Sequence, residues 1–350
     1  IVELPLPPKP VDIADNKDAR KAYCRAAAEV MNTNAGAFRR SCRTRMTMEA
    51  VRRFKGKEFF IPWSFDYRGR AYPIPAFLTP QDTDFGKACI RFADEDIVSK
   101  DAEKWLAFQV ATTYGLDKST MDERLEWVKN NLFTVKSVAT DPIDNIGSWE
   151  NTSEPWQFLA ACEEYYHCVI LKDRKTTGLC VATDATCSGL QILAGLARDK
   201  KTAQLVNVLP SDRPQDAYQV VADEAKPNIP KQLHKVWGRK EVKRTVMTIP
   251  YNAKPFSNRS YIRDALKEKG VEIEKDDLTI TVKAVRDAMN KIVPGPMAVM
   301  SWIEKEVAKQ FKDNPNLTLT WTTPSGFVVN QKIQKKKVEK LELQLLGRCI

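Results

Sequence analysis

The stretch that most constrains the fold is residues 180–191, which read CVATDATCSGLQ. A short apolar run ends on one carboxylate, Asp184, then a turn of small residues leads into an apolar pattern at helical spacing from Leu190. This order predicts a core strand over residues 178–183, then a turn with free backbone carbonyls, then a helix. Mg²⁺ prefers oxygen ligands and often takes one or two carboxylates together with substrate phosphates. The stretch therefore predicts a candidate cation site at the end of the strand.

Composition limits the class of protein. The 350 residues allow about two domains, and no apolar run approaches the roughly 18 residues of a membrane helix. The formal net charge of +10 predicts a polyanionic partner. The 8 cysteines include no CxxC pair and there are only 2 histidines, which argues against a zinc site and favours a reducing compartment.

Helix signals dominate the chain. Asp15 or Asn16 caps a helix that runs to about Met31. Further helices are predicted at 48–55, from Ser99 to Gly115, from a start marked by Ser119 and Asp122, and from Pro155 to about Leu171. Downstream of Asp212 the pattern is mostly helical, with breaks at Pro227, Pro230, Pro250 and 294–296. A hairpin is predicted for 317–331, and the fold class is therefore α+β.

One helix carries a chemical pattern. Arg239, Lys243, Met247 and Tyr251 recur every four residues, so they share one broad helix face. Two cations and an aromatic ring suit a nucleoside triphosphate, because Arg and Lys bind phosphate oxygens and the ring lies near the sugar or base. Pro250 predicts that the helix kinks or ends just before Tyr251. Taken alone, the pattern also fits an amphipathic surface helix.

Together the two segments resemble the first two polymerase motifs of the single-subunit, phage-type DNA-directed RNA polymerases, a family that also serves mitochondria and chloroplasts. The first motif is a strand that ends in Asp, followed by small residues and Ser-Gly-x-Gln. The resemblance implies that Asp184 binds the catalytic metals and that Ala185 lends a backbone carbonyl to a metal. The family usually has Gly at the second position, and a backbone role should survive Ala.

The second motif carries over to the helix in the same way. The resemblance implies that Lys243 contacts the triphosphate and that Arg239, one turn earlier, also binds the nucleotide. Tyr251 matches the Tyr that stacks near the incoming nucleotide and helps distinguish ribose from deoxyribose. Asn252 stands where the family has Gly. Asn tolerates the left-handed conformation better than most residues, so the turn is retained.

A third match covers residues 65–73, which read FDYRGRAYP. The family has a similar signature close to the template and the RNA–DNA hybrid, which implies nucleic-acid binding by Arg68, Arg70 and Tyr72. Gly in this signature permits a tight turn, and the two Arg side chains can bind phosphates of the nucleic-acid backbone. Residues 206–218 resemble the segment that joins palm to fingers, and residues 322–327 resemble a hairpin late in the fingers.

The resemblance implies an α+β fragment of a right-hand polymerase. Residues 1–57 correspond to the end of the thumb and connecting helices, 58–205 to the first half of the palm, and 206–350 to the mostly helical fingers. The family's second metal-binding Asp lies in a His-Asp motif that this sequence lacks. Because two aspartates bridge two metals in this chemistry, we expect the chain to be incomplete and inactive by itself.

The resemblance implies Mg²⁺ as the cofactor, and a DNA template, an RNA product and nucleoside triphosphates as partners. It implies no association with a membrane, and a monomer when the chain is complete. The expected location is the cytoplasm, that of the host for a phage protein, with mitochondria and chloroplasts as alternatives.

Two other interpretations of the function stay open. A family A DNA polymerase fragment shares the metal Asp and the Lys-to-Tyr helix, and a noncatalytic nucleic-acid-binding protein or a split-polymerase subunit shares the basic charge. The SGLQ tail of 188–191 and the Arg-Gly-Arg signature favour the RNA polymerase.

Overall fold

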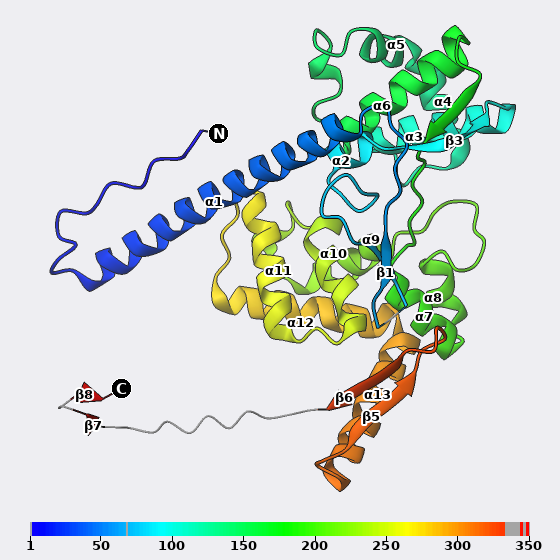
Figure 1. Ribbon diagram of the computed structural model, residues 1–350. Coiled ribbons are helices and arrows are strands. Elements are labelled where there is room, and N and C mark those ends of the chain that lie inside the picture. The colour runs from blue at the N-terminus through cyan, green and yellow to red at the C-terminus, as the bar shows by residue number, and fades with distance from the viewer. Residues whose placement is uncertain (1, 68, 333–343, 346–347, 350) are drawn as a thin grey trace. The chain divides into compact units, whose positions relative to one another are not determined.

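The computed structural model describes residues 2–67, 69–332, 344–345 and 348–349 (Figure 1). The chain forms two compact units: unit 1 comprises Ile1–Asp66 and Arg70–Thr183, and unit 2 comprises Tyr67–Gly69 and Asp184–Ile350. Both contain helices and small antiparallel sheets, so the predicted α+β class is confirmed. The main division falls at Asp184, whereas the family resemblance places the boundary between palm and fingers at 205/206.

Unit 1 begins with a long helix, α1, which spans Lys17–Phe54 and is capped by the side chain of Asn16. The prediction of two helices separated at about Met31 is wrong, because nothing in residues 32–47 is strong enough to end a helix. This stretch has no proline, and its one glycine, Gly36, costs only about 1 kcal/mol. The Thr33 hydroxyl donates to the Glu29 carbonyl at 2.9 Å, which leaves the helical backbone intact.

The core of unit 1 is a group of helices: α3 (Lys100–Tyr114), α4 (Met121–Asn130), α5 (Leu132–Thr140) and α6 (Pro155–Tyr165), with the π-helical turn η2 (Tyr166–Leu171) after α6 and the short elements α2 (Asp84–Ala88) and η1 (Ile146–Ser148). Ser99 caps α3 and Gly115 ends it at φ 137°, as predicted. The cap of α4 is Thr120 in a capping box with Glu123, one residue later than the predicted Ser119.

Two small antiparallel sheets complete unit 1. β1 (Trp63–Phe65) pairs with β2 (Ala71–Pro73), and β3 (Arg91–Ile97) pairs with β4 (Thr176–Leu179). The predicted strand over 178–183 is therefore wrong at both ends. The ladder stops at the pair Arg91↔Leu179 because β3 begins at Arg91, and residues 180–183 pair with no strand in the described part of the chain. Asp184 consequently lies in a loop beyond the strand.

Unit 2 is mostly helical, as predicted for the chain beyond Asp212. Its helices are α7 (Ser188–Ala197), α8 (Lys200–Leu205), α9 (Ala217–Ala225), α10 (Arg239–Thr248), α11 (Pro255–Glu268), α12 (Lys275–Ile292) and α13 (Pro294–Asp313), with turns η3 (Lys226–Asn228), η4 (Lys231–Leu233) and η5 (Ile249–Tyr251). Helices α9 to α12 lie close together (Figure 1). They share one apolar core, in which Val221, Val242, Ile262 and Val285 are fully buried.

The predicted hairpin is confirmed as β5 (Thr318–Thr322) and β6 (Val328–Lys332), with Thr318 opposite Lys332. Two short strands, β7 (Gln344–Leu345) and β8 (Arg348–Cys349), pair with each other. Among the residues that the structure describes, no helix combines the length and the apolar character needed to cross a membrane.

Candidate active site in the second unit

Asp184 lies in the exposed loop that precedes α7. One carboxylate oxygen accepts a hydrogen bond from the Ala185 N–H at 2.8 Å. The carboxylate makes no ion pair with any residue of the described part of the chain. Most of its lone pairs are therefore available to a cation, because a carboxylate has about four acceptor sites.

The turn into α7 is sharp. Cys187 adopts the left-handed conformation (φ 50°, ψ 65°), and its carbonyl accepts hydrogen bonds from the N–H groups of Leu190 (3.0 Å) and Gln191 (3.2 Å). Its side chain packs against the core of unit 2, and burial raises the pKa of the thiol. Cys187 is therefore a neutral packing residue that joins the Asp184 loop to the core.

Helix α10 is amphipathic in the way that the sequence predicts. Its inner face buries Val242 and Val246 completely, whereas Lys243 and Met247 are exposed on the other face. Lys243 forms no ion pair with the residues that the structure describes, so its ammonium group is available to an anion. Pro250 ends the regular helix at Thr248, and a 3₁₀ turn carries the chain to Tyr251, which confirms the predicted break.

Arg239 has a partner that the sequence did not indicate. Its Nε atom donates to the Asp216 carboxylate at 2.6 Å, and its guanidinium carbon lies 5.3 Å from the centroid of the Tyr218 ring. Asp216 also caps α9 by accepting from the N–H of Tyr218 at 3.0 Å. Arg239 is therefore held against α9, with its terminal N–H groups unpartnered among the described residues.

The two motif segments meet at Gly189. A Cβ atom at Gly189 would lie 2.9 Å from the Pro250 Cβ and 3.3 Å from the Tyr251 ring, so only Gly permits this approach of α7 to η5. Next to it, the Ser188 and Tyr251 hydroxyl oxygens are 3.4 Å apart. Asn252 follows at φ 65°, which confirms the expected left-handed turn. Residues some sixty positions apart thus form one surface of unit 2.

The donor set for a metal is small. Asp184 supplies one carboxylate and Ala185 one backbone carbonyl, and no group of three or more His, Cys, Asp or Glu side chains in the described ranges could hold a metal ion. Mg²⁺ is often bound by one or two carboxylates plus substrate phosphates. The residues present therefore fit Mg²⁺ only in combination with further oxygen ligands, such as those of a bound triphosphate.

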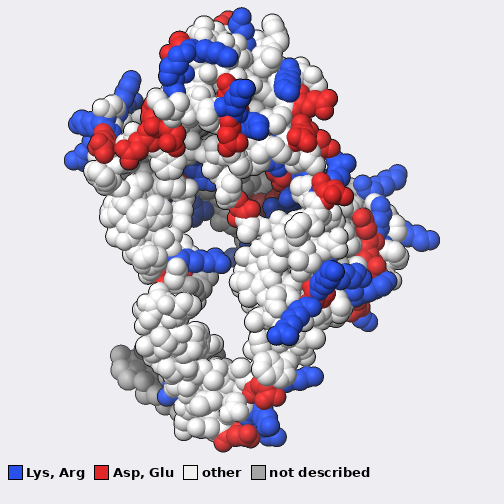
Figure 2. Space-filling model, turned by 90° about the vertical axis from the view of Figure 1, so that its right-hand side faces the viewer, with Lys and Arg blue, Asp and Glu red and all other residues white. Residues whose placement is uncertain are grey.

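The residues predicted to bind nucleic acid, Arg68, Arg70 and Tyr72, lie in or next to the turn between β1 and β2. Arg68 lies outside the described residues. Gly69 adopts φ 77°, as expected for a tight turn, and the Arg70 N–H donates to the Asp66 carboxylate at 3.0 Å. Arg70 is exposed, and Tyr72 lies on β2 opposite Ser64. On the face shown in Figure 2, Lys and Arg side chains are interspersed with Asp and Glu instead of forming one basic patch.

Unit 1 has its own cavity of about 1070 Å³, lined by aromatic residues such as Phe59, Trp63 and Phe92 and by cations such as Lys87. None of the predicted site residues that the structure describes lines this cavity. Its size alone assigns it no chemistry.

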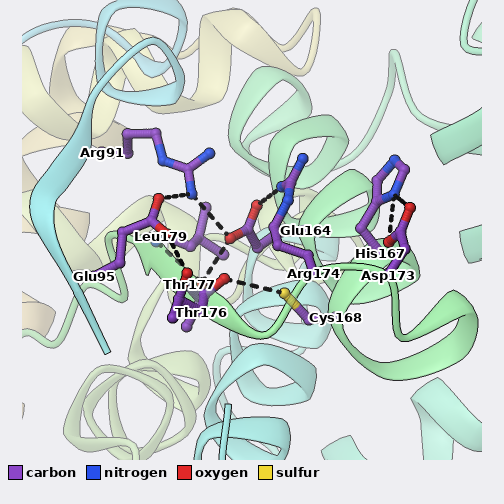
Figure 3. A network of polar contacts seen from close by, with 10 residues as sticks. All are labelled: Arg91, Glu95, Glu164, His167, Cys168, Asp173, Arg174, Thr176, Thr177 and Leu179. Carbon is purple, nitrogen blue, oxygen red and sulfur yellow. Dashed lines mark hydrogen bonds and ion pairs between the residues drawn. The ribbon is translucent and has the colours of Figure 1, made fainter. Parts of the chain in front are cut away.

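A buried carboxylate in unit 1 was not found from the sequence. Glu164 on α6 accepts hydrogen bonds from Arg91 at 3.3 Å, from the Thr177 hydroxyl at 2.7 Å and from Arg174 (Figure 3). Arg91 also bonds Glu95 at 2.7 Å. This network fastens β3 and β4 to α6. The sequence did not indicate the network as a whole, because its members come from β3, α6, β4 and the loop before β4.

An exposed carboxylate in a loop, a neighbouring helix with a free cation and a ring at its end define a candidate site for a nucleotide and a cation. Comparison with known proteins agrees with this class. The model of the DNA-dependent RNA polymerase family matches residues 97–348, so the chain belongs to that family.

Individual relatives span phages and organelles. The chain is 30% identical over 318 residues to the mitochondrial DNA-directed RNA polymerase of Neurospora crassa, covering 85% of this chain and 22% of that protein. It is 29% identical over 404 residues to the DNA-directed RNA polymerase of Enterobacteria phage K11, covering 98% and 44%. It is 31% identical over 334 residues to the chloroplastic DNA-directed RNA polymerase 3 of Nicotiana sylvestris, covering 87% and 34%. The chain spans less than half the length of each.

Proposed function

We propose that this chain is part of a DNA-directed RNA polymerase that joins ribonucleoside triphosphates on a DNA template. Asp184 and Ala185 hold Mg²⁺, while Arg239, Lys243 and Tyr251 bind the incoming nucleotide. The observation that supports this most is the close approach at Gly189, which brings the first turn of α7 against Pro250 and Tyr251. The family match and the names of the relatives favour an RNA polymerase over the family A DNA polymerase alternative.

Phosphodiester formation is an in-line displacement. Mg²⁺, held by Asp184 and Ala185 with further oxygen ligands, would supply charge stabilisation at the attacking hydroxyl and the leaving pyrophosphate. The chain's own residues position the reactants. Lys243 neutralises charge on the triphosphate through its unpaired ammonium group, and the terminal N–H groups of Arg239 add hydrogen bonds while Asp216 fixes its stem. Tyr251 places its ring near the sugar, and its hydroxyl distinguishes ribose from deoxyribose.

The remaining proposals rest on the resemblance of the motifs to those of the family. Residues 1–57 form the end of the thumb, 58–205 the first half of the palm, and 206–350 the fingers of a right-hand polymerase that acts as a monomer. Arg68, Arg70 and Tyr72 contact the nucleic acid. Asp184 is one carboxylate where two-metal chemistry uses two. The 350 residues alone should therefore show no templated synthesis. They should still bind nucleic acid, with an affinity that falls steeply with salt, because their net charge is positive.

The test uses a full-length polymerase that contains this chain. Asp184→Asn should abolish RNA synthesis and change DNA affinity less than about twofold, because the substitution removes one metal-ligand charge and leaves the basic surface unaltered. Asp212→Asn, at an exposed position of the same unit, is the matched control and should be active. Near-normal elongation by Asp184→Asn would refute the assignment.

The nucleotide-binding residues are tested in the same assay. Lys243→Ala should raise the KM for nucleotides. Lys240→Ala should not, although it removes another exposed cation of α10, one that is paired with Glu268 of α11. Tyr251→Phe should relax discrimination against deoxynucleotides. Ser188→Ala removes the hydroxyl 3.4 Å from that of Tyr251 and separates loss of this contact from loss of a sugar contact. An effect confined to template affinity would contradict the role of Lys243.

A further inference from the structure

Asn207 is placed to hold the loop that contains Asp184. It follows α8 in the left-handed conformation, with φ 61°. Its side-chain oxygen accepts from the Gln215 N–H at 2.7 Å, and its side-chain nitrogen donates to the Gln215 carbonyl at 2.9 Å and to the Thr186 hydroxyl at 3.2 Å. One amide therefore closes the 207–215 loop and reaches the residue two positions after Asp184.

A second side-chain amide joins the same two segments of the chain. The Gln191 side-chain nitrogen donates to the Val206 carbonyl at 2.8 Å, and Val206 is fully buried in the core of unit 2. Cys187 packs against that core as well. The residues that follow Asp184 are thus attached to the core by Cys187 and Gln191 and to Asn207 by Thr186, whereas Asp184 itself is exposed.

We infer that Asn207 is a positioning residue for Asp184, acting through the hydroxyl of Thr186. A ligand on a loop functions only when neighbouring contacts hold it within about 0.5 Å of its working geometry. The bond between Asn207 and Thr186 supplies this restraint, and neither residue needs to touch metal or nucleotide. The inference rests on the proposed function, in which Asp184 binds the metal.

The choice of variants follows from the backbone. Asn207→Gly keeps the left-handed conformation and removes the amide, because Gly adopts positive φ without strain. Thr186→Val replaces the hydroxyl with a methyl group of similar size, and Thr186→Ser keeps the hydroxyl. Arg198→Gly is the control for adding Gly at a left-handed position, since Arg198 has φ 50° and an exposed side chain.

The first measurement needs only the 350-residue chain. Alkylation of Cys187 by iodoacetamide, located by mass spectrometry, reports opening of the loop. Its rate should rise about fivefold in Thr186→Val, roughly the worth of one hydrogen bond, and at least as much in Asn207→Gly, which loses three. It should stay within about twofold of wild type in Thr186→Ser and Arg198→Gly. The buried Cys162 reports unfolding of unit 1, and thermal unfolding of each variant checks that unit 2 stays folded. Wild-type alkylation rates at Cys187 in both Asn207→Gly and Thr186→Val would overturn the inference.

The second measurement uses the full-length polymerase. Asn207→Gly and Thr186→Val should raise the Mg²⁺ concentration for half-maximal synthesis several-fold and leave the KM for nucleotides unchanged, with recovery in Thr186→Ser. If Cys187 becomes reactive but the Mg²⁺ dependence does not move, Asn207 holds the loop without positioning a metal ligand, and the inference fails at that step. If Asp184→Asn itself remains active, the proposed function fails, whatever the Asn207 variants show.

Discussion

Two aspartates, Asp82 in unit 1 and Asp184 in unit 2, show how the same side chain can have opposite surroundings. The Asp82 side chain is completely buried and accepts hydrogen bonds from Arg43 at 2.8 Å, the Leu78 N–H at 2.8 Å and the Thr83 N–H at 2.7 Å. Asp184 is exposed and accepts from its neighbour's N–H at 2.8 Å. The protein supplies several hydrogen-bond donors to the first carboxylate, whereas most acceptor sites of the second are unoccupied by protein donors.

The difference has a plain electrostatic cause. Burial opposes ionisation of Asp82, but the hydrogen bonds from Thr83, Arg43 and Leu78 outweigh it and hold the pKa of Asp82 below its usual value. An exposed carboxylate needs no such compensation, because water solvates it. A carboxylate that the fold has saturated therefore belongs to the structure, and an unsaturated, exposed one is a candidate for binding.

The largest expected effect is on Asp82. Asp82→Ala should lower the free energy of unfolding of unit 1 by about 3 kcal/mol, because it leaves buried N–H donors and Arg43 without their acceptor. Urea unfolding monitored in unit 1 measures the change. Asp15→Ala, at an exposed position, is the control and should alter it by less than about 0.5 kcal/mol. A loss below about 1 kcal/mol at Asp82 would mean that Asp82 is not a structural centre.

A smaller loss is expected from Gly86→Ala, since the added Cβ would lie 2.4 Å from the Asp82 carboxylate. Crowding of this kind costs about 1–3 kcal/mol. Gly147→Ala, in the same unit with nothing within 4 Å of its Cβ, is the control. Equal stability of the two variants in urea would contradict the tight packing around Asp82.

In unit 2, Gly189→Ala should cost about 1 kcal/mol, because its Cβ would meet Pro250 at 2.9 Å. Gly195→Ala lies on the same helix with open space around its Cβ and should stabilise by about 0.5–1 kcal/mol. Thermal unfolding of the two variants gives shifts of opposite sign. Shifts of the same sign would remove the support for a close approach between α7 and η5.

The lowered pKa of Asp82 also predicts that the stability of unit 1 depends on pH. Because the folded-state pKa of Asp82 lies below the usual value of 3.8, its contribution to stability is present above about pH 4 and is lost as the pH falls through the folded pKa. Acid titration of the urea midpoint of unit 1 should therefore be shallower below pH 4 in Asp82→Asn than in wild type. Parallel titrations would show that Asp82 does not have a lowered pKa.

The smallest effect on stability is expected at the other aspartate. Asp184→Asn should change the free energy of unfolding by less than about 0.5 kcal/mol, because an exposed loop carboxylate has no buried partner to lose. Differential scanning calorimetry would measure this directly. A loss comparable to that of Asp82→Ala would show that Asp184 is a structural residue, and the contrast between the two units would fail.

Features that depend on neighbouring residues were predictable from the sequence. The Ser99 cap and Gly115 end of α3, the Pro155 start of α6, the end of α10 before Tyr251 and the β5–β6 hairpin are all confirmed. The amphipathic face of α10 was equally readable, because helical periodicity is a local property. The family was also recognisable, since its motifs are short runs of adjacent residues.

Partners far apart in the chain were decided only by the tertiary structure. Hydrogen bonds join Asp82 to Arg43, 39 positions apart, Arg239 to Asp216, 23 positions apart, and Asn207 to Thr186, 21 positions apart. The end of β4 depended on where its partner β3 begins. A sequence pattern specifies which side chains share a face, but whether a carboxylate becomes saturated or stays available depends on donors that only folding brings within hydrogen-bond distance.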